Sequence, residues 1–207
     1  MVYSRSGYNG IKKPDILRRK IFRNYDKPDD LYSLNPEKCQ DDFMTSYSLN
    51  PITDEDGPAI IDIFNYYILN SYAAYPENPV PYEFFGMFAE IAKNYPSVVA
   101  RDPDGTVAGF GMLRPHNPMP AFRHAAEITY FIRPEQTGVG IGSAMLAYLE
   151  DEGKKKGITI ILASISSLNE GSIRFHARHG FTGCGKFSKV GIKKGVVFDT
   201  VWMQKDL

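Results

Sequence analysis

The sequence predicts a mixed α/β fold, and three observations support this prediction. A strand, a glycine-rich turn, a helix and a second strand follow one another over residues 125–163, which is the pattern of a βαβ unit with parallel strands. Two helix patterns and a β-hairpin pattern precede this unit. The chain has 207 residues, 43% of them hydrophobic, which is enough for one well-buried domain.

Residues 1–46 differ in composition from the rest of the chain. They are rich in Tyr, Asn, Asp, Lys and Pro, and the spacing of Ile16, Leu17 and Ile21 allows at most one short amphipathic helix. Regular patterning begins at Tyr47. We therefore expect an N-terminal arm over residues 1–46, packed on the domain or on a partner subunit, and a folded domain over residues 47–207.

Two helices are expected at the start of the domain. Thr53 with the three acidic residues after it resembles an N-cap and first turn, and apolar side chains follow at helical spacing: Ile60, Ile63, Phe64 and Tyr67. A second helix is expected to begin near Pro81 and to carry four apolar side chains on one face: Phe84, Phe85, Phe88 and Ile91.

The remaining elements follow in order. Residues 97–113 have the pattern of a β-hairpin with a turn over 102–105, and residues 115–120 form a proline-rich loop. The βαβ unit then consists of a strand over 125–132, a helix to about residue 156 and a strand over 158–163. The chain ends with a helix over 170–179 and two strands, over 181–190 and 196–203.

The turn of the βαβ unit, residues 138–142, has glycine at every second position. Glycine lets a backbone approach an anion closely, and the free N–H groups of the following helix attract phosphate. Ser143 stands where a dinucleotide fingerprint has a small residue, usually glycine, and the next strand ends without a carboxylate. A P-loop would need a lysine before Ser143. A glycine-rich turn that only reverses the chain is the alternative.

Composition excludes several classes of partner. The 24 basic and 24 acidic residues cancel, so we expect neither nucleic acid nor a membrane surface as partner. Cys39 and Cys184 form neither a disulfide framework nor a metal cluster, the four histidines are dispersed, and we expect no metal. The first residues lack the apolar core of a signal peptide, and no apolar run is long enough to span a bilayer. A cytoplasmic protein with a small-molecule partner is expected.

Five segments together resemble one known family. Residues 64–70, 122–127, 137–142, 169–181 and 199–204 are similar, in this order and separation, to the phosphinothricin N-acetyltransferase group of the GNAT superfamily, which includes methionine sulfone and methionine sulfoximine acetyltransferases. The GNAT turn is written Gln/Arg-x-x-Gly-x-Gly/Ala. This chain has Thr137 in the first position, with Gln136 one place early.

The resemblance implies a fold, a reaction and a co-substrate. The fold is a GNAT domain, with a mixed, mostly antiparallel twisted sheet, helices on both faces, and splayed central strands that bind acetyl-CoA. The reaction is transfer of the acetyl group to the primary amine of an amino-acid-like compound, by direct attack in a ternary complex. Family members are often dimers, so a homodimer is expected. The rival functions are protein N-terminal or lysine acetylation, and a non-catalytic acyl-CoA sensor.

Glu127 is the candidate general base, acting directly or through water, since an ammonium ion must lose a proton before it can attack a thioester. Strand alternation places Glu127, Thr129 and Phe131 on one face, and Glu127 matches the position of the family's catalytic glutamate. The alternative is a structural pair between this glutamate and a neighbouring arginine. If Glu127→Gln kept normal turnover at every pH, the assignment to the base would fail.

His176 lies where many GNAT enzymes have a tyrosine proposed as general acid to the leaving sulfur. It is a candidate acid, a group that hydrogen-bonds to a ligand, or a histidine satisfied by a nearby carbonyl. His124 is expected to orient the substrate or line its site, whereas His116 has no assigned role. Cys184 suggests a rival covalent route, but we expect it to be a small residue on a buried strand.

The family also suggests the binding residues. Tyr130, Phe131 and Ile132 would offer main-chain groups to the pantetheine arm. The pyrophosphate would be bound by the turn and helix start: Gly138, Val139, Gly140, Ile141, Gly142 and Ser143. Asn169 and Arg178 match further cofactor contacts, although Asn169 also suits an N-cap. The acceptor would lie against Pro120, Ala121, Phe122 and His124. Residues 72–77 and Val197 depart from the group, which weighs against phosphinothricin and methionine sulfone as acceptors.

Overall fold

The computed structural model describes residues 47–207. The expected N-terminal arm, the short helix that its sequence allows and Cys39 lie outside the described residues. Within the described part, the helices are α3 (Gly57–Asn70), α4 (Phe85–Asn94), α5 (Ile141–Lys155) and α6 (Glu170–Arg178), with 3-10 turns η2 (Asp54–Asp56), η3 (Tyr82–Phe84), η4 (Pro120–Phe122) and η5 (Pro134–Gln136). The strands are β1 (Ser48–Asn50), β2 (Ser97–Arg101), β3 (Val107–Pro115), β4 (Ala125–Ile132), β5 (Ile160–Ser166), β6 (Thr182–Lys193) and β7 (Val196–Asp206).

The strands form a seven-stranded sheet with the order β1-β2-β3-β4-β5-β7-β6. Neighbouring strands are antiparallel except for β4 and β5, which are parallel and are joined by α5, as the βαβ pattern predicts. The predicted fold class is therefore confirmed. The short strand β1 has no signal in the sequence, and β5 begins at Ile160, two residues after the predicted start.

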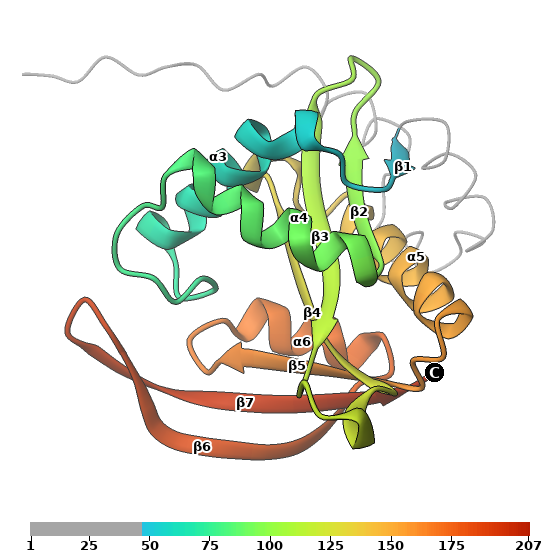
Figure 1. Cartoon of the computed structure of the whole chain (residues 1–207). Helices are drawn as coiled ribbons and strands as arrows, with labels where there is room; N and C mark the ends of the chain where they lie inside the picture. Colours follow the sequence, from blue (N-terminus) through green and yellow to red (C-terminus); the bar gives the residue numbers. More distant parts are fainter. Residues whose placement is uncertain (1–46) are drawn as a thin grey trace, which may run out of the picture. The chain divides into compact units, whose positions relative to one another are not determined.

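Helices cover both faces of the sheet (Figure 1). On one face, Phe64 of α3 and Phe88 of α4 pack edge-on or tilted against Phe131 and Phe110, with ring centroids 5.4 and 5.7 Å apart respectively. On the other face, Met145 of α5 lies over β3, and α6 packs against β4. Successive side chains of β4 therefore point to opposite faces of the sheet. This alternation decides on which face each site residue of β4 lies.

The strands β4 and β5 pair over only three residues. The parallel register runs from Ala125–Ile160 to Glu127–Leu162 and stops there. Beyond that point the two strands diverge, as Figure 1 shows. Among the described residues, 47–207, the edge of β4 that faces β5 has no strand beside it from Ile128 onward. The expected splay of the central strands is confirmed, and Glu127 is the last paired residue before it.

The first helix begins slightly later than Thr53 suggests. The backbone N–H of Thr53 donates to Asp56 Oδ2 at 2.9 Å, which caps η2, and α3 follows from Gly57. Asp56 is buried and pairs with Arg101 of β2, so this cap also ties the start of α3 to the sheet. In the same way, η3 precedes α4 where a single helix from Pro81 is expected.

The hairpin between β6 and β7 holds the chain that follows α3. The side chain of Lys193 is buried, and its Nζ donates to the carbonyl oxygens of Ile68, Ser71 and Ala74 at 2.7, 2.8 and 2.7 Å. Burial lowers the pKa of Lys193. The backbone N–H of Lys194 also donates to Glu77 at 2.8 Å, so residues 71–77, which we call the acceptor loop, are fixed by this hairpin.

Candidate functional site

The glycine turn has the backbone geometry that an anion site requires. Gly138 and Gly140 have φ angles of +81° and +99°, in the left-handed region that other residues rarely adopt. Gly140 is the N-cap of α5, and its carbonyl accepts from the amides of Ser143 and Ala144 at 3.0 and 3.1 Å. The amides at the very start of α5 precede these bonds and have no intrahelical acceptor. The turn therefore presents N–H donors at the positive end of a helix dipole.

A cavity of about 580 Å³ lies beside this turn. Its walls come from the end of β4, the glycine turn, the start of α5 and α6, with additional residues from α3 and the acceptor loop. The lining residues are Tyr67, Ala73, Tyr130, Phe131, Ile132, Thr137, Gly138, Gly140, Gly142, Ser143, Asn169, Gly171, Ser172, Phe175, Arg178 and His179.

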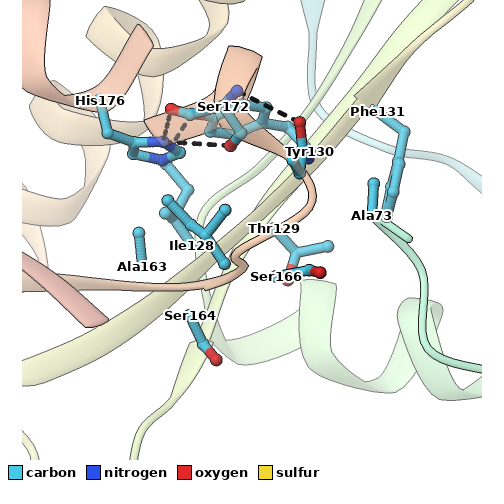
Figure 2. Close-up of a pocket in the computed structure, with 12 residues that line it drawn as sticks. Ala73, Ile128, Thr129, Tyr130, Phe131, Ala163, Ser164, Ser166, Ser172 and His176 are labelled. Atoms are coloured by element: carbon cyan, nitrogen blue, oxygen red, sulfur yellow. Dashed lines mark hydrogen bonds between the residues drawn. The ribbon is translucent and has the colours of Figure 1, made fainter. Parts of the chain in front are cut away.

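A second cavity, of about 90 Å³, opens between the diverging strands (Figure 2). It is lined on one side by residues 128–131 of β4 and on the other by residues 163–166 of β5, with His176 behind them. The two cavities share Tyr130, Phe131 and Asn169 among their lining residues. They therefore adjoin, and together they lead from the glycine turn to the point where β4 and β5 separate.

His176 is buried in α6, and both of its ring nitrogens have partners (Figure 2). Nδ1 lies 2.8 Å from the carbonyl oxygen of Ser172, which can only accept, so Nδ1 carries the hydrogen. Nε2 lies 2.7 Å from the hydroxyl of Tyr130, which then donates to it. Burial lowers the pKa of His176, against the raising effect of the Ser172 carbonyl, and burial raises the pKa of Tyr130. A neutral imidazole bound to a neutral phenol is the stable arrangement.

The ends of α6 also contribute to the larger cavity. Asn169 is the N-cap, with its side-chain oxygen accepting from the Ser172 amide at 3.2 Å, and it lines both cavities. At the other end, His179 Nε2 contacts the Ser143 hydroxyl at 2.9 Å, which links α6 to the first turn of α5. Arg178, beside it, is the cationic group of this wall.

Glu127 lies on the opposite face of β4 from Tyr130 and is 7% exposed. Arg114, its direct partner in the β3–β4 register, binds Oε2, and His116 Nδ1 contacts Oε1 at 2.9 Å. Tyr75 of the acceptor loop interacts electrostatically with Arg114 and Glu127, although burial is the main cause that raises the pKa of its hydroxyl. The carboxylate is thus held between a guanidinium and an imidazole.

Aromatic rings surround His116. Phe122 of η4 and Trp202 of β7 lie edge-to-face with the imidazole, at centroid distances of 6.2 and 6.0 Å. Tyr75 stacks on Phe198 at 5.8 Å and brings its hydroxyl to 3.5 Å from the Ser164 carbonyl. These rings and the Arg114–Glu127–His116 group form what we call the acceptor side, whereas the glycine turn and α6 form the cofactor side.

The model of the acetyltransferase (GNAT) family matches residues 60–181, which is more than half of the chain. The match includes the cofactor side and all of the acceptor side except Phe198 and Trp202. The chain belongs to the GNAT acetyltransferase family. It is therefore an acyltransferase, and the resemblance found in the sequence is confirmed.

Individual relatives agree with this assignment. An L-methionine sulfoximine/L-methionine sulfone acetyltransferase of Pseudomonas aeruginosa is 33% identical over 156 residues, covering 73% of this chain and 90% of the relative. A GNAT phosphinothricin acetyltransferase of Sinorhizobium meliloti, solved in complex with acetyl-CoA, has a TM-score of 0.75 at 31% identity, with 78% of this chain and 88% of that chain covered. A ribosomal-protein-alanine N-acetyltransferase of Brucella melitensis has a TM-score of 0.73 at 31% identity, with coverages of 77% and 99%.

The structure gathers most of the predicted cofactor residues of this GNAT domain around the larger cavity. Tyr130, Phe131, Ile132, Ser143, Asn169, Arg178 and three of the glycines, Gly138, Gly140 and Gly142, line it. Val139 and Ile141 do not line it: the side chain of Val139 is exposed, and that of Ile141 is buried, which leaves only the backbone of Ile141 for this site. The carbonyl of Ile132 already accepts a hydrogen bond from the Tyr67 hydroxyl at 2.6 Å.

The predicted acceptor residues are distributed differently. Phe122 lies beside His116, and Pro120 and Ala121 are exposed in the same turn, η4. His124 is exposed in the turn before β4, where its backbone carbonyl accepts from Thr159 and Ile160, and the histidine that contacts Glu127 is His116. Cys184 is exposed near a bulge of β6, so the expectation of a buried strand position is wrong.

Several residues of the site have no role in the sequence prediction. Arg114 lies in β3 and His116 follows the last residue of that strand, two positions on, which is the local sign that the two share a face. Tyr67 and His179 line the larger cavity from α3 and from the end of α6. Within residues 47–207, no helix is both long and apolar enough to cross a membrane, and no three His, Cys, Asp or Glu side chains gather as a metal site.

Proposed function

We propose that this GNAT protein transfers the acetyl group of acetyl-CoA to the primary amine of a small, amino-acid-like acceptor, by direct attack in a ternary complex. One observation carries the proposal. The strands β4 and β5 separate immediately after Glu127, and the opening between them adjoins a cavity that begins at an anion-binding turn. A phosphate-bearing acyl carrier that follows this path would bring its thioester close to the buried carboxylate.

The cofactor side suits coenzyme A by its donors and its shape. The backbone amides at the start of α5 would bind the pyrophosphate, with Ser143 beside them and Arg178 as a cation for a further phosphate. The unpaired β4 edge at Tyr130 and Phe131 would hold the pantetheine arm as an added strand. At Gly142 an added Cβ would lie 3.3 Å from the side chains of Ile132 and Phe175, a tight contact that glycine avoids in this wall.

The acceptor side favours a small amine. Phe122, Trp202 and Tyr75 enclose the Glu127 region with aromatic rings, and Arg114 places a cation near it, where the carboxylate of an amino-acid-like acceptor could bind. A protein substrate would need a wide groove there. Val197, by contrast, is half-exposed on β7 and is not a wall of either cavity.

The chemistry requires a proton acceptor for the ammonium and a place for the leaving thiolate. Glu127 is the carboxylate at the point where β4 and β5 separate, and we assign to it the negative charge that promotes deprotonation. His176 is neutral, and its single N–H is bound to the Ser172 carbonyl, so we assign it a binding role: it orients the Tyr130 hydroxyl at the cavity wall. Of the roles expected for His176, we therefore propose that of a group that hydrogen-bonds, and not that of a general acid.

A thiol-release assay tests the proposal. Acetyl-CoA is incubated with a panel of amino acids, their sulfone and sulfoximine analogues and phosphinothricin, together with peptides that have a free N-terminus or a lysine. Amine-dependent release of coenzyme A with members of the small-molecule panel is the expected result. Release with peptides alone would favour the protein acetyltransferase, and tight binding of acetyl-CoA without release by any amine would favour the sensor.

We also propose a homodimer and a cytoplasmic location. Five apolar side chains of the β6–β7 hairpin are 40% exposed or more: Phe187, Val190, Ile192, Val196 and Val197. Such a cluster on one hairpin is suited to contact with a second copy. The free thiol of Cys184 agrees with a reducing compartment. Light scattering of the wild type and of Ile192→Asp tests the dimer, which should dissociate in the variant.

A further inference from the structure

The contacts of Glu127 leave little room for this carboxylate to take a proton itself. Arg114 occupies Oε2, and the His116 Nδ1 lies 2.9 Å from Oε1. An added proton on either oxygen would have to compete with one of these donors. The residue is also 7% exposed, so few water molecules can reach it to carry a proton away.

The same contacts prepare His116 to take a proton. An ionised carboxylate only accepts hydrogen bonds, so the hydrogen of the neutral imidazole sits on Nδ1 and the lone pair sits on Nε2. The contact with Glu127 thus leaves Nε2 as the ring nitrogen that can accept a proton. Carboxylate–histidine pairs serve other enzymes in this way, with the carboxylate fixing the tautomer and orientation of the base.

His116 is also placed where an acceptor amine would approach. Its side chain is 33% exposed, with Phe122 and Trp202 against its edges, whereas Glu127 lies behind it. The ionisable groups recorded around the pair are Arg114 on β3 and Tyr75 on the acceptor loop, both of which interact with Glu127. Of the two members of this pair, the imidazole is therefore the one that reaches solvent and can return a proton to it.

We propose that His116 is the group that takes the proton from the acceptor ammonium, and that Glu127 is the positioning residue that fixes its tautomer. This inference rests on the proposed function. The ammonium proton moves to Nε2 of His116 and then to solvent. The free amine attacks the thioester carbon, so that a C–N bond forms as the C–S bond breaks, and the second nitrogen proton passes to the departing thiolate. The products are the amide, the free thiol and one proton in solvent.

The decisive variant is His116→Asn. The asparagine amide nitrogen can replace Nδ1 as donor to Glu127, but no basic nitrogen remains in the place of Nε2. We expect kcat/KM for the amine to fall about 100-fold or more, with the KM for acetyl-CoA unchanged, and the acid limb of the pH profile to disappear. Asn117→Ala is the control for disturbance of the same loop, because it keeps the imidazole and should keep the acid limb.

Two further measurements separate a chemical role from a structural one. Imidazole added to His116→Ala should restore part of the activity. In His116→Asn, the activity toward aminoacetonitrile should fall much less than the activity toward a strongly basic amine. Aminoacetonitrile is a weakly basic amine that is uncharged at neutral pH, so no base is needed to remove a proton before it attacks. If neither variant folds, the wild-type acid limb is measured at several temperatures, since imidazole ionisation shifts with temperature far more than carboxyl ionisation.

The outcomes are distinguishable from failure of the proposed function. A wild-type enzyme that releases no thiol with any amine contradicts the transferase itself. An active wild type whose His116→Asn variant keeps its acid limb and stays within twofold of wild-type kcat/KM contradicts the role of His116 and returns the proton to Glu127. A wild-type acid limb whose position on the pH axis does not change with temperature would also contradict the role of His116.

Discussion

The cofactor side and the acceptor side of this site differ in the groups, backbone or side chain, that they offer to a ligand. The cofactor side consists of one continuous strand–turn–helix segment, residues 128–143, closed by α6, and much of what it offers is backbone. The acceptor side consists of side chains from β3, β4, β7, η4 and the acceptor loop, together with His116, which follows β3. A backbone site tolerates changes in most of its side chains. Under the proposed function, the acceptor side would therefore have more freedom to change specificity, while the cofactor side would keep the shared co-substrate.

The largest expected effect separates the two sides directly. Glu127→Gln should lower kcat/KM for the amine by about 100-fold or more, because it removes the charge on which deprotonation depends. Calorimetry should find the affinity for acetyl-CoA unchanged, since Glu127 does not line the cavity of the cofactor side. A parallel loss of acetyl-CoA binding would show that the two sides are not independent.

Lys193 tests how far the acceptor side depends on distant support. Lys193→Met should reduce the free energy of unfolding by about 3 kcal/mol, because three carbonyl groups lose their common donor. It should also raise the KM for the amine, because the acceptor loop is released, with little change in acetyl-CoA affinity. Lys194→Met is the matched control. Its exposed Nζ binds one carbonyl, that of Leu69, and the loss should be about 1 kcal/mol or less.

Gly140 tests the cofactor side alone. Gly140→Ala places a side chain at a φ of +99°, which costs about 1–2 kcal/mol, and the Kd for acetyl-CoA should rise about tenfold. Gly105→Ala is the control, since Gly105 has a φ of +81° in the turn between β2 and β3. Chemical denaturation should find both variants destabilised. Weaker binding in the Gly105 variant would mean that strain, and not the anion turn, is being measured.

The smallest effect concerns the pH dependence of stability. Burial lowers the pKa of His176 in the native state, so the unfolded state binds more protons as the pH falls below about 6.5. The stabilisation is thus complete above that pH and decreases toward the native pKa, by at most about 1.4 kcal/mol per pH unit. Denaturant titrations from pH 8 to pH 5 should show this slope in the wild type and in Tyr130→Phe, which keeps the imidazole. His176→Asn should flatten it.

Most of the predicted cofactor residues line one cavity, and the sequence information that places them there is local. The alternation of β4, the glycines at 138, 140 and 142 and the N-cap at Asn169 each follow from a few neighbouring residues. The βαβ pattern then places them at one end of a parallel strand pair, which is enough to establish the fold class and the place of the splay.

The acceptor side depends on the pairing register of β3 and β4, which cannot be predicted from the sequence. Arg114 pairs opposite Glu127, but the connection between β3 and β4 runs through the irregular residues 116–124, so counting along the chain does not give the pairing. The contact between His116 and Glu127 cannot be predicted from the sequence for the same reason. Lys193 donates a hydrogen bond to the carbonyl of Ile68, which lies 125 positions earlier in the sequence. No local pattern around Lys193 predicts that this lysine is buried.

The outermost strand has a consequence for how copies of the chain meet. β6 ends the sheet, and its pairing with β7 shifts between Gly183 and Gly185 and again between Phe187 and Gly191. Such bulges, together with Lys186 and Lys189 along the rim, discourage another strand from extending the ladder. Self-association through this hairpin would then use side chains in face-to-face contact, which closes after two copies and does not continue into a fibre.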